Sequence, residues 1–258
     1  MGSLLLGPGH NAAVTQITAH RRPFLVELYR SAVGKKWLMA ISGVALLIYL
    51  VAHLIGNLKL YLGLDPISGI PQIDEYGEAL RSLLSPILPN HVPLWIMRTG
   101  LFIAFVVHVD AATRLTFMNR RARQTDYQGG RDYLVANYAS RTMRWSGFIV
   151  LAFVLFHLAD LTWGLEPAAS ASFGRGAIHH NVLASLSRPQ VAFFYVVAML
   201  VLAPHIYHGT WSLFQSLGVN NPRFNQWRRY LAITLTAILT IGNLSFPVAV
   251  LAGWVQPV

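Results

Sequence analysis

The sequence has no cysteine among its 258 residues, and charged residues make up only 12% of the chain. Without cysteine the chain forms no disulfide and offers no thiolate of its own to a metal. The charged fraction is well below the roughly 25% that is usual for a soluble domain, whereas 54% of the residues are hydrophobic. This composition is typical of an integral membrane protein.

Acidic residues are the scarcer charges: 10 Asp and Glu against 20 Lys and Arg give a formal net charge of +10. A basic chain invites a nucleic-acid interpretation. Here, however, the Lys and Arg residues flank the apolar segments, as topology signals do. We therefore read the excess of positive charge as membrane orientation and expect no nucleic-acid partner.

Five apolar segments are long enough for a transmembrane helix, which needs about 20 residues. We expect an all-α integral membrane fold, with one membrane domain over residues 1–258 and a cytoplasmic N-terminal segment over 1–35. The spans are expected at roughly 37–61, 93–118, 142–164, 189–217 and 229–254. Of the 20 Lys and Arg residues, 15 lie on the side of the N-terminus. The positive-inside rule then places the N-terminus in the cytoplasm and, after five spans, the C-terminus outside.

Four of the five spans carry a histidine well inside the apolar run. Helix geometry places His53 and His157 about 23 Å from the cytoplasmic ends of their spans, and His108 and His205 about 23 Å from the outer ends of theirs. In a hydrocarbon core about 30 Å thick, the first two form an outer pair and the other two an inner pair. Two histidines at one depth on different helices can be the axial ligands of a haem iron. The pattern predicts a four-helix bundle that binds two haems.

Other interpretations of these histidines remain open. They are also compatible with core histidines that bond backbone carbonyls, and with a proton relay in a transporter. Histidines can also bind iron–sulfur clusters of the mixed His/Cys kind, for which another subunit would have to supply cysteine. His208 lies three residues after His205 and is either its rival as the inner ligand or a residue that bonds a haem propionate or nearby backbone.

Three glycines lie at the levels of the predicted haems. Gly43 and Gly147 each precede an outer histidine by ten residues, which puts them near the inner level, and Gly100 precedes His108 by eight, which puts it near the outer level. A glycine lets a flat macrocycle approach the backbone closely. Ordinary packing of helices through small residues explains the same glycines equally well.

At this point the sequence resembles a known family, the five-helix, two-haem cytochrome b membrane anchor of bacterial succinate dehydrogenases and fumarate reductases. The resemblance rests on four segments: GKKWLMAISGVALLIYLVAHLIGNLKLYLG, FVVHVDAATRL, FVLFHLADLTWG and HIYHGTWSLFQSLG. It implies that His53, His108 and His157 stand at ligand positions. The family's fourth ligand falls four residues before the glycine of a Gly-x-Trp/Tyr run, which here favours His205 over His208.

The resemblance, which runs from about residue 28 to the end, implies an electron-transfer role within an enzyme complex. A flavoprotein subunit with FAD oxidises succinate, which this chain does not bind, and an iron–sulfur subunit passes the electrons on. The anchor's two haem b groups carry them to a membrane quinone, menaquinone in many two-haem members and otherwise ubiquinone. The resemblance also implies a bacterial plasma membrane location and is compatible with an additional small membrane subunit. The alternatives are a dihaem cytochrome b of another oxidoreductase and a membrane protein without a redox role.

The segment IDEYGEALRSLLSP after the first span resembles a region of that family rich in polar residues and close to the outer haem. It makes Tyr76, Glu78 and Arg81 candidates for quinone binding, although a short helix that caps the bundle explains the segment as well. Asp160 follows His157 by about one turn. It is a candidate either for relaying protons from quinol or for anchoring a histidine.

Overall fold

The computed structural model describes residues 23–122, 134–219 and 221–257, and side chains throughout these ranges except for Leu25 and residues 134–141. Of the predicted cytoplasmic segment 1–35, residues 1–22 lie outside the described residues. All secondary-structure elements assigned within the described ranges are helices.

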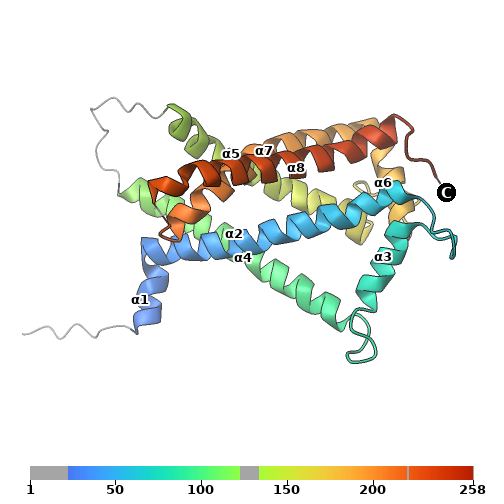
Figure 1. The fold of residues 1–258 in the computed structure, drawn as a ribbon, viewed down its shortest axis with the longest axis horizontal. Helices are drawn as coiled ribbons and strands as arrows, with labels where there is room; N and C mark the ends of the chain where they lie inside the picture. The colour runs from blue at the N-terminus through green and yellow to red at the C-terminus, as the bar shows by residue number, and fades with distance from the viewer. Residues whose placement is uncertain (1–22, 123–133, 220, 258) are drawn as a thin grey trace, which may run out of the picture.

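Five long helices run along the molecule (Figure 1). They are α2 (Ala32–Asn57), α4 (Val92–Arg121), α5 (Leu134–Leu158), α7 (Pro189–Ser216) and α8 (Asn225–Leu251). A 3₁₀ segment over Leu58–Leu62 extends α2, a π-helical turn over Ala159–Trp163 extends α5, and a 3₁₀ turn over Pro222–Phe224 precedes α8. All five are long and apolar enough to cross a membrane, which confirms the predicted multi-pass helical class.

Several span boundaries differ from the prediction by a few residues, and two of these differences have a clear local reason. Helix α2 begins at Ala32 rather than near residue 37, because the Ser31 side chain accepts a hydrogen bond of 2.9 Å from the backbone N–H of Gly34 and caps the helix before the apolar run starts. Helix α8 ends at Leu251 rather than near residue 254. Gly253 just beyond it has φ of +70°, a left-handed conformation that ends helices.

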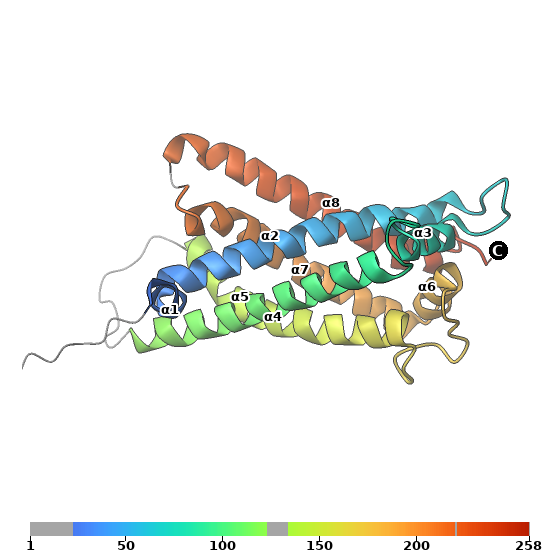
Figure 2. The same ribbon diagram turned by 90° about the horizontal axis from the view of Figure 1, so that it is seen from below.

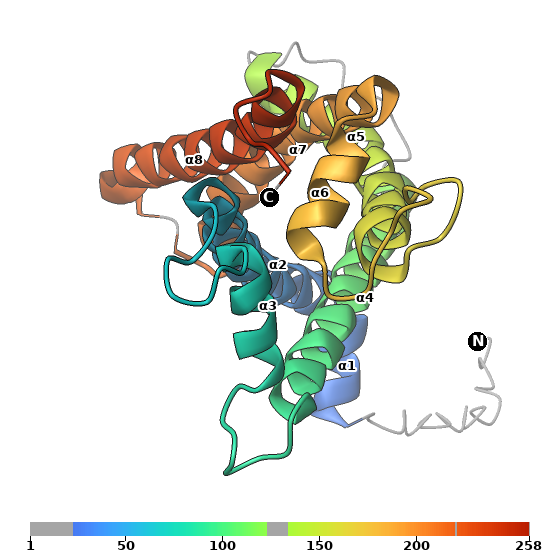
Figure 3. The ribbon, with the colours of Figure 1, turned by 90° about the vertical axis from the view of Figure 1, so that its right-hand side faces the viewer.

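Four of the long helices form a bundle and the fifth lies against its side (Figure 3). Helix α2 packs against α4 and α7, and α5 packs against α7, so α2 and α5 stand on one diagonal of the bundle and α4 and α7 on the other. Helix α8 packs mainly along α7 and also touches α2. A Cβ atom on Gly242 of α8 would lie 2.8 Å from the side chain of Leu54, so the close approach of α8 to α2 depends on this glycine.

Two short helices cap one end of the bundle, at the end where the C-terminus lies, and α1 (Phe24–Arg30) lies at the opposite end (Figure 2). The capping helices are α3 (Gln72–Arg81) and α6 (Ile178–Leu186). Tyr76 of α3 packs on Gly56 of α2, where a Cβ atom would lie 2.6 Å from the Tyr76 ring. Asp74 accepts a hydrogen bond of 2.8 Å from the backbone N–H of His179 and so joins α3 to α6.

The buried core lies between α2, α5, α7 and α8 and continues under the two capping helices. Its members include Leu54, Phe153, Tyr195, Ile206 and Leu239. By contrast, large apolar side chains on the outer faces of the long helices are exposed, among them Ile48, Phe102, Phe148, Phe193 and Ile241. Exposed apolar faces of this extent fit contact with lipid and not with water.

Candidate metal centres

The four predicted histidines lie in two pairs, each across a diagonal of the bundle. The rings of His53 on α2 and His157 on α5 have centroids 5.9 Å apart, and those of His108 on α4 and His205 on α7 have centroids 6.4 Å apart. A metal bound between two opposed imidazoles lies about 2 Å from each nitrogen, so the two ring centroids are then roughly 6 Å apart. Both separations therefore match the spacing of two imidazoles that share one metal.

The inner histidines are each held at Nδ1 by a serine. Ser42 Oγ lies 3.3 Å from His108 Nδ1, and Ser146 Oγ lies 3.3 Å from His205 Nδ1. Each serine donates its own proton to a backbone carbonyl of the preceding turn, at 2.6 Å for Ser42 and 3.1 Å for Ser146. The serine oxygen is thereby left to accept from Nδ1–H. His108 Nδ1 also lies 3.1 Å from the carbonyl oxygen of Met39, which can only accept.

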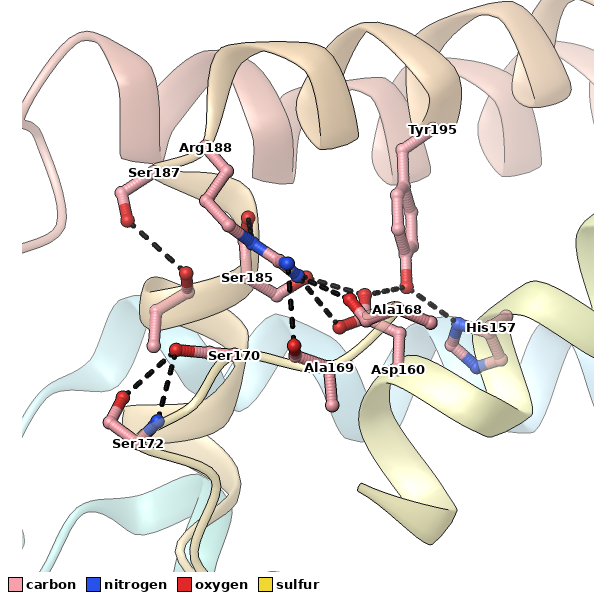
Figure 4. A network of polar contacts seen from close by, with 11 residues as sticks. His157, Asp160, Ala168, Ala169, Ser170, Ser172, Ser185, Ser187, Arg188 and Tyr195 are labelled. Carbon is pink, nitrogen blue, oxygen red and sulfur yellow. Dashed lines mark hydrogen bonds and ion pairs between the residues drawn. The ribbon is translucent and has the colours of Figure 1, made fainter. Parts of the chain in front are cut away.

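Tyrosine hydroxyls hold the outer histidines in the same way. Tyr195 Oη lies 3.2 Å from His157 Nδ1 and donates its proton to Asp160 Oδ2 at 2.9 Å, so it accepts from the imidazole N–H (Figure 4). Tyr49 Oη lies 3.5 Å from His53 Nδ1, a longer and weaker contact.

All four histidines consequently have Nδ1 occupied, while no hydrogen bond from the described residues reaches their Nε2 atoms. A metal-bound histidine normally donates its second ring nitrogen to a neighbouring group, which fixes the tautomer and the ring orientation. Three or more His, Cys, Asp or Glu side chains grouped around one metal position do not occur in the described part of the chain. A haem iron needs only two ligands from the protein, because the macrocycle supplies the other four.

The two levels are separated by the same helical distance on both sides of the bundle. Ser42 marks the inner level on α2 and precedes His53 by 11 residues; Ser146 marks it on α5 and precedes His157 by 11. At 1.5 Å per residue the levels lie about 16 Å apart along each helix. The two pairs are thus separate centres, one above the other.

The predicted rival His208 lies outside both pairs. It is half-buried on α7, and its ring packs against that of Tyr207 with centroids 5.4 Å apart. His205, one turn earlier, is the α7 histidine whose ring faces His108. The geometry favours His205 as the inner ligand, and the ligand role itself stays a prediction.

The predicted glycines have different surroundings. A Cβ atom on Gly43 would touch the His108 ring at 3.4 Å, whereas one on Gly147 or Gly100 would meet no atom of the described chain within 4 Å. Gly147 is half-buried in the bundle, so the space beside it lies at the inner level. Gly100 is exposed on the outer surface of α4. The open space at Gly147 is compatible with a flat group beside the inner histidines.

A buried cation lies near the inner pair, towards the start of α2. Lys35 is 3% exposed, and its Nζ atom lies 3.8 Å from Asp110 Oδ2 without making a hydrogen bond to any described residue. It stands one turn before Met39, whose carbonyl contacts His108. The Lys35 Nζ atom also lies 3.2 Å from the centre of the Tyr29 ring, so an anionic substituent such as a haem propionate would share this ammonium group with Tyr29 and Asp110.

The three residues predicted for quinone lie on α3, at the end of the bundle where the C-terminus lies. Tyr76 packs on Gly56, which follows His53 by three residues, so its ring lies near the outer pair. Glu78 and Arg81 form an ion pair of 2.9 Å, with 70% and 28% of their side chains exposed. Their part in quinone binding stays a prediction. Close by, burial lowers the pKa of His179 while the carboxylate of Asp74 opposes that shift.

Sequence reasoning missed the residues that hold the histidines. Ser42 and Ser146 each begin a Ser-Gly motif, in which Ser-Gly is followed by an apolar run and His-Leu: SGVALLIYLVAHL and SGFIVLAFVLFHL. Their identical spacing to the outer histidines is the signal that could have identified them. Tyr195, Ser185 and Arg188 have no comparable signal, because they come from other segments and meet Asp160 only in the folded chain.

Comparison with known proteins identifies no relative: no family model, no curated protein and no solved structure matches the chain.

Proposed function

We propose that the chain is a cytochrome b membrane anchor that holds two haem b groups, His53 and His157 binding the outer one and His108 and His205 the inner one. One observation carries this proposal. The four histidines form two pairs at the spacing of a shared metal, with every Nδ1 engaged and no Nε2 hydrogen-bonded to a described residue. Packed core histidines would be expected to use both ring nitrogens for hydrogen bonds within the protein.

The protein's own contribution is to position and orient the ligands. When bound, a haem b group supplies a one-electron redox centre. Ser42, Ser146 and Tyr195 fix the Nδ1–H tautomer, which leaves the lone pair of Nε2 available for the metal. Lys35 would hold a propionate of the inner group, and the space at Gly147 would admit the macrocycle.

The two levels suit electron transfer across a membrane, because about 16 Å along the helices separates them. We place the inner level near the cytoplasm and the N-terminus, where the excess of Lys and Arg would attract an acidic partner subunit. The outer level lies beneath α3, near Tyr76, where we place the quinone. The resemblance to succinate dehydrogenase anchors supplies the identity of the complex: an iron–sulfur subunit and a flavoprotein as partners, and succinate:quinone oxidoreduction as the reaction.

A reduced-minus-oxidised spectrum of the purified complex tests the proposal. We expect the absorption bands of b-type haem, and we expect succinate to reduce part of it when the flavoprotein and iron–sulfur subunits are present. A protein that copurifies with no haem would contradict the cytochrome assignment. Haem that succinate leaves oxidised, while formate or hydrogen reduces it through other partner subunits, would assign the cytochrome to a different oxidoreductase.

A further inference from the structure

A buried acid behind the outer histidine is enclosed by three side chains, one from α6, one from α7 and one from the residue before α7. Asp160 is 1% exposed and lies in the π-helical turn that follows α5. Its Oδ2 atom accepts from Ser185 Oγ of α6 and from Tyr195 Oη of α7, and its Oδ1 atom pairs with Arg188 Nη2 at 3.1 Å (Figure 4). A π-helical insertion at a helix end is often found at a functional site.

The guanidinium group of Arg188 is itself fixed by backbone carbonyls. Its Nη2 atom donates to the carbonyl oxygen of Ala168 at 2.6 Å, and its Nη1 atom to that of Ala169 at 3.4 Å. The carboxylate and the guanidinium therefore each have several partners, as a buried ion pair requires. The ion pair therefore fixes the position of Asp160 Oδ2, which accepts the hydrogen bond from the Tyr195 hydroxyl.

Tyr195 links this ion pair to the outer histidine in one direction only. A hydroxyl has a single proton, and Tyr195 gives it to Asp160 Oδ2 at 2.9 Å, since a carboxylate oxygen can only accept. The Tyr195 oxygen is then the acceptor for His157 Nδ1–H at 3.2 Å. The order of donors is thus His157 to Tyr195 to Asp160.

Within the described residues, the other three histidines have no such chain to a buried charge. Ser42 and Ser146 accept hydrogen bonds from His108 and His205, and they donate their own hydrogen bonds to backbone carbonyls. Tyr49 lies 3.5 Å from His53. Among the four candidate ligands, only His157 is connected to a carboxylate through hydrogen bonds between described side chains.

We infer that Tyr195 and Asp160 are positioning residues for the outer centre, which hold His157 and lower the midpoint potential of the haem it binds. The inference rests on the proposed function. A hydrogen bond towards a carboxylate makes an imidazole a stronger electron donor to its metal and so favours the oxidised metal. Because Arg188 balances the charge of Asp160, the effect reaches the ligand through the hydrogen bond of Tyr195.

Two single variants of the holoprotein test the inference. Their redox titrations are monitored by optical spectra, and electron paramagnetic resonance reports on their ferric haems. Tyr195→Phe removes the link and leaves the contacts of Asp160 with Arg188 and Ser185 in place. Asp160→Asn keeps an acceptor for Tyr195 but removes the charge. Both are expected to raise the midpoint potential of the outer haem and to shift its resonance signal, while the inner haem keeps both properties.

A double variant and a matched control make the test sharper. Because the hydrogen bonds are in series, Tyr195→Phe should shift the outer potential less in the Asp160→Asn background than in the wild type. Tyr207→Phe, the same change about three turns farther along α7 and beside His208, should leave the outer potential unchanged. If Asp160→Asn does not assemble, Tyr195→Phe decides the question alone, because it keeps the ion pair.

The outcomes separate this inference from the proposed function. Two haems that keep their wild-type potentials and signals in Tyr195→Phe would overturn the inference and leave the cytochrome assignment standing. Equal shifts in the midpoint potentials of both haems would also overturn it, because among the described residues the hydrogen bonds through Tyr195 to Asp160 reach the outer pair and not the inner one. A wild-type protein without haem would overturn both.

Discussion

The hairpins α2–α4 and α5–α7 carry the same Ser-Gly motif, yet they surround their outer histidines differently. In each hairpin the serine contacts the histidine of the next span at 3.3 Å, so a serine holds the inner centre from both sides, and His108 has the Met39 carbonyl as a second acceptor. The outer centre is held unequally, by Tyr49 at 3.5 Å on one side and by Tyr195 at 3.2 Å, backed by Asp160, on the other. The repeated motif thus builds the inner site, and residues outside the motif distinguish the outer one.

The acids that follow the histidines show the same contrast. Asp110, two residues after His108, is 37% exposed and pairs with the exposed Arg114 at 2.7 Å. Asp160, three residues after His157, has a completely buried side chain and pairs with Arg188 at 3.1 Å. Asp160 lies one residue farther from its histidine than Asp110 does, and this spacing, together with the π-helical turn, directs Asp160 into the bundle. Asp110 also lies 3.8 Å from the buried Lys35, but of the two acids Asp160 is the one that hydrogen bonds between described side chains connect to its histidine.

Removing the arginine partner of each acid should give the largest difference between the hairpins. Arg188→Gln leaves a buried carboxylate without its counter-charge, which costs about 3–5 kcal/mol of stability. Arg114→Gln breaks a largely exposed ion pair, whose contribution is within about 1 kcal/mol. Thermal unfolding in detergent compares the two variants. Equal losses of stability in the two variants would show that the buried ion pair contributes no more to stability than the exposed one.

Removing the serine of each hairpin should have unequal effects on the inner centre. Ser146→Ala deletes the one acceptor that the described residues give His205 Nδ1, and loss of such an outer partner typically weakens a metal site about 10- to 100-fold. Ser42→Ala leaves the carbonyl oxygen of Met39 at 3.1 Å from His108 Nδ1, so we expect a smaller loss. Haem titration of each apoprotein measures the affinity, and the outer haem serves as the internal control. Equal losses in the two variants would show that the Met39 carbonyl does not replace Ser42 as the acceptor.

A small change at Gly147 should distinguish the two explanations of the glycines. In the apoprotein Gly147→Ala meets no described atom within 4 Å, and the gain in helix propensity stabilises the protein by up to about 1 kcal/mol. If the open space receives the macrocycle, the same variant binds the inner haem more weakly. Unfolding of the apoprotein and haem titration measure both effects on one variant. Stabilisation with unchanged haem affinity would favour simple helix packing.

Depth along the spans was sufficient to group the histidines from sequence. The ring pairs at 5.9 and 6.4 Å are the two pairs expected from counting residues into each span. Counting works because transmembrane helices are regular and bounded by the bilayer, so position in the sequence translates directly into depth. Whether His205 or His208 faces His108 depended instead on the rotation of α7, which the structure supplies.

The groups behind the histidines were not predictable by the same means. Ser42 contacts a histidine on another helix, so its role depends on how α2 and α4 pack together. Tyr195, Ser185 and Arg188 converge on Asp160 from segments 25 or more residues away in the sequence. Helix α6 is short and lies between spans, where hydropathy carries no signal for it.

The pairing of the histidines is the central claim, and haem content of double variants tests it most directly. We expect two haem b groups per chain in the wild type and one in His53→Ala/His157→Ala, because both changes fall on the outer centre. We expect none in His53→Ala/His108→Ala, because each change empties a different centre, and two in the control His208→Ala. A pyridine haemochrome assay on monodisperse protein gives the counts. One haem retained in His53→Ala/His108→Ala, or none in His53→Ala/His157→Ala beside two in the wild type, would contradict the account.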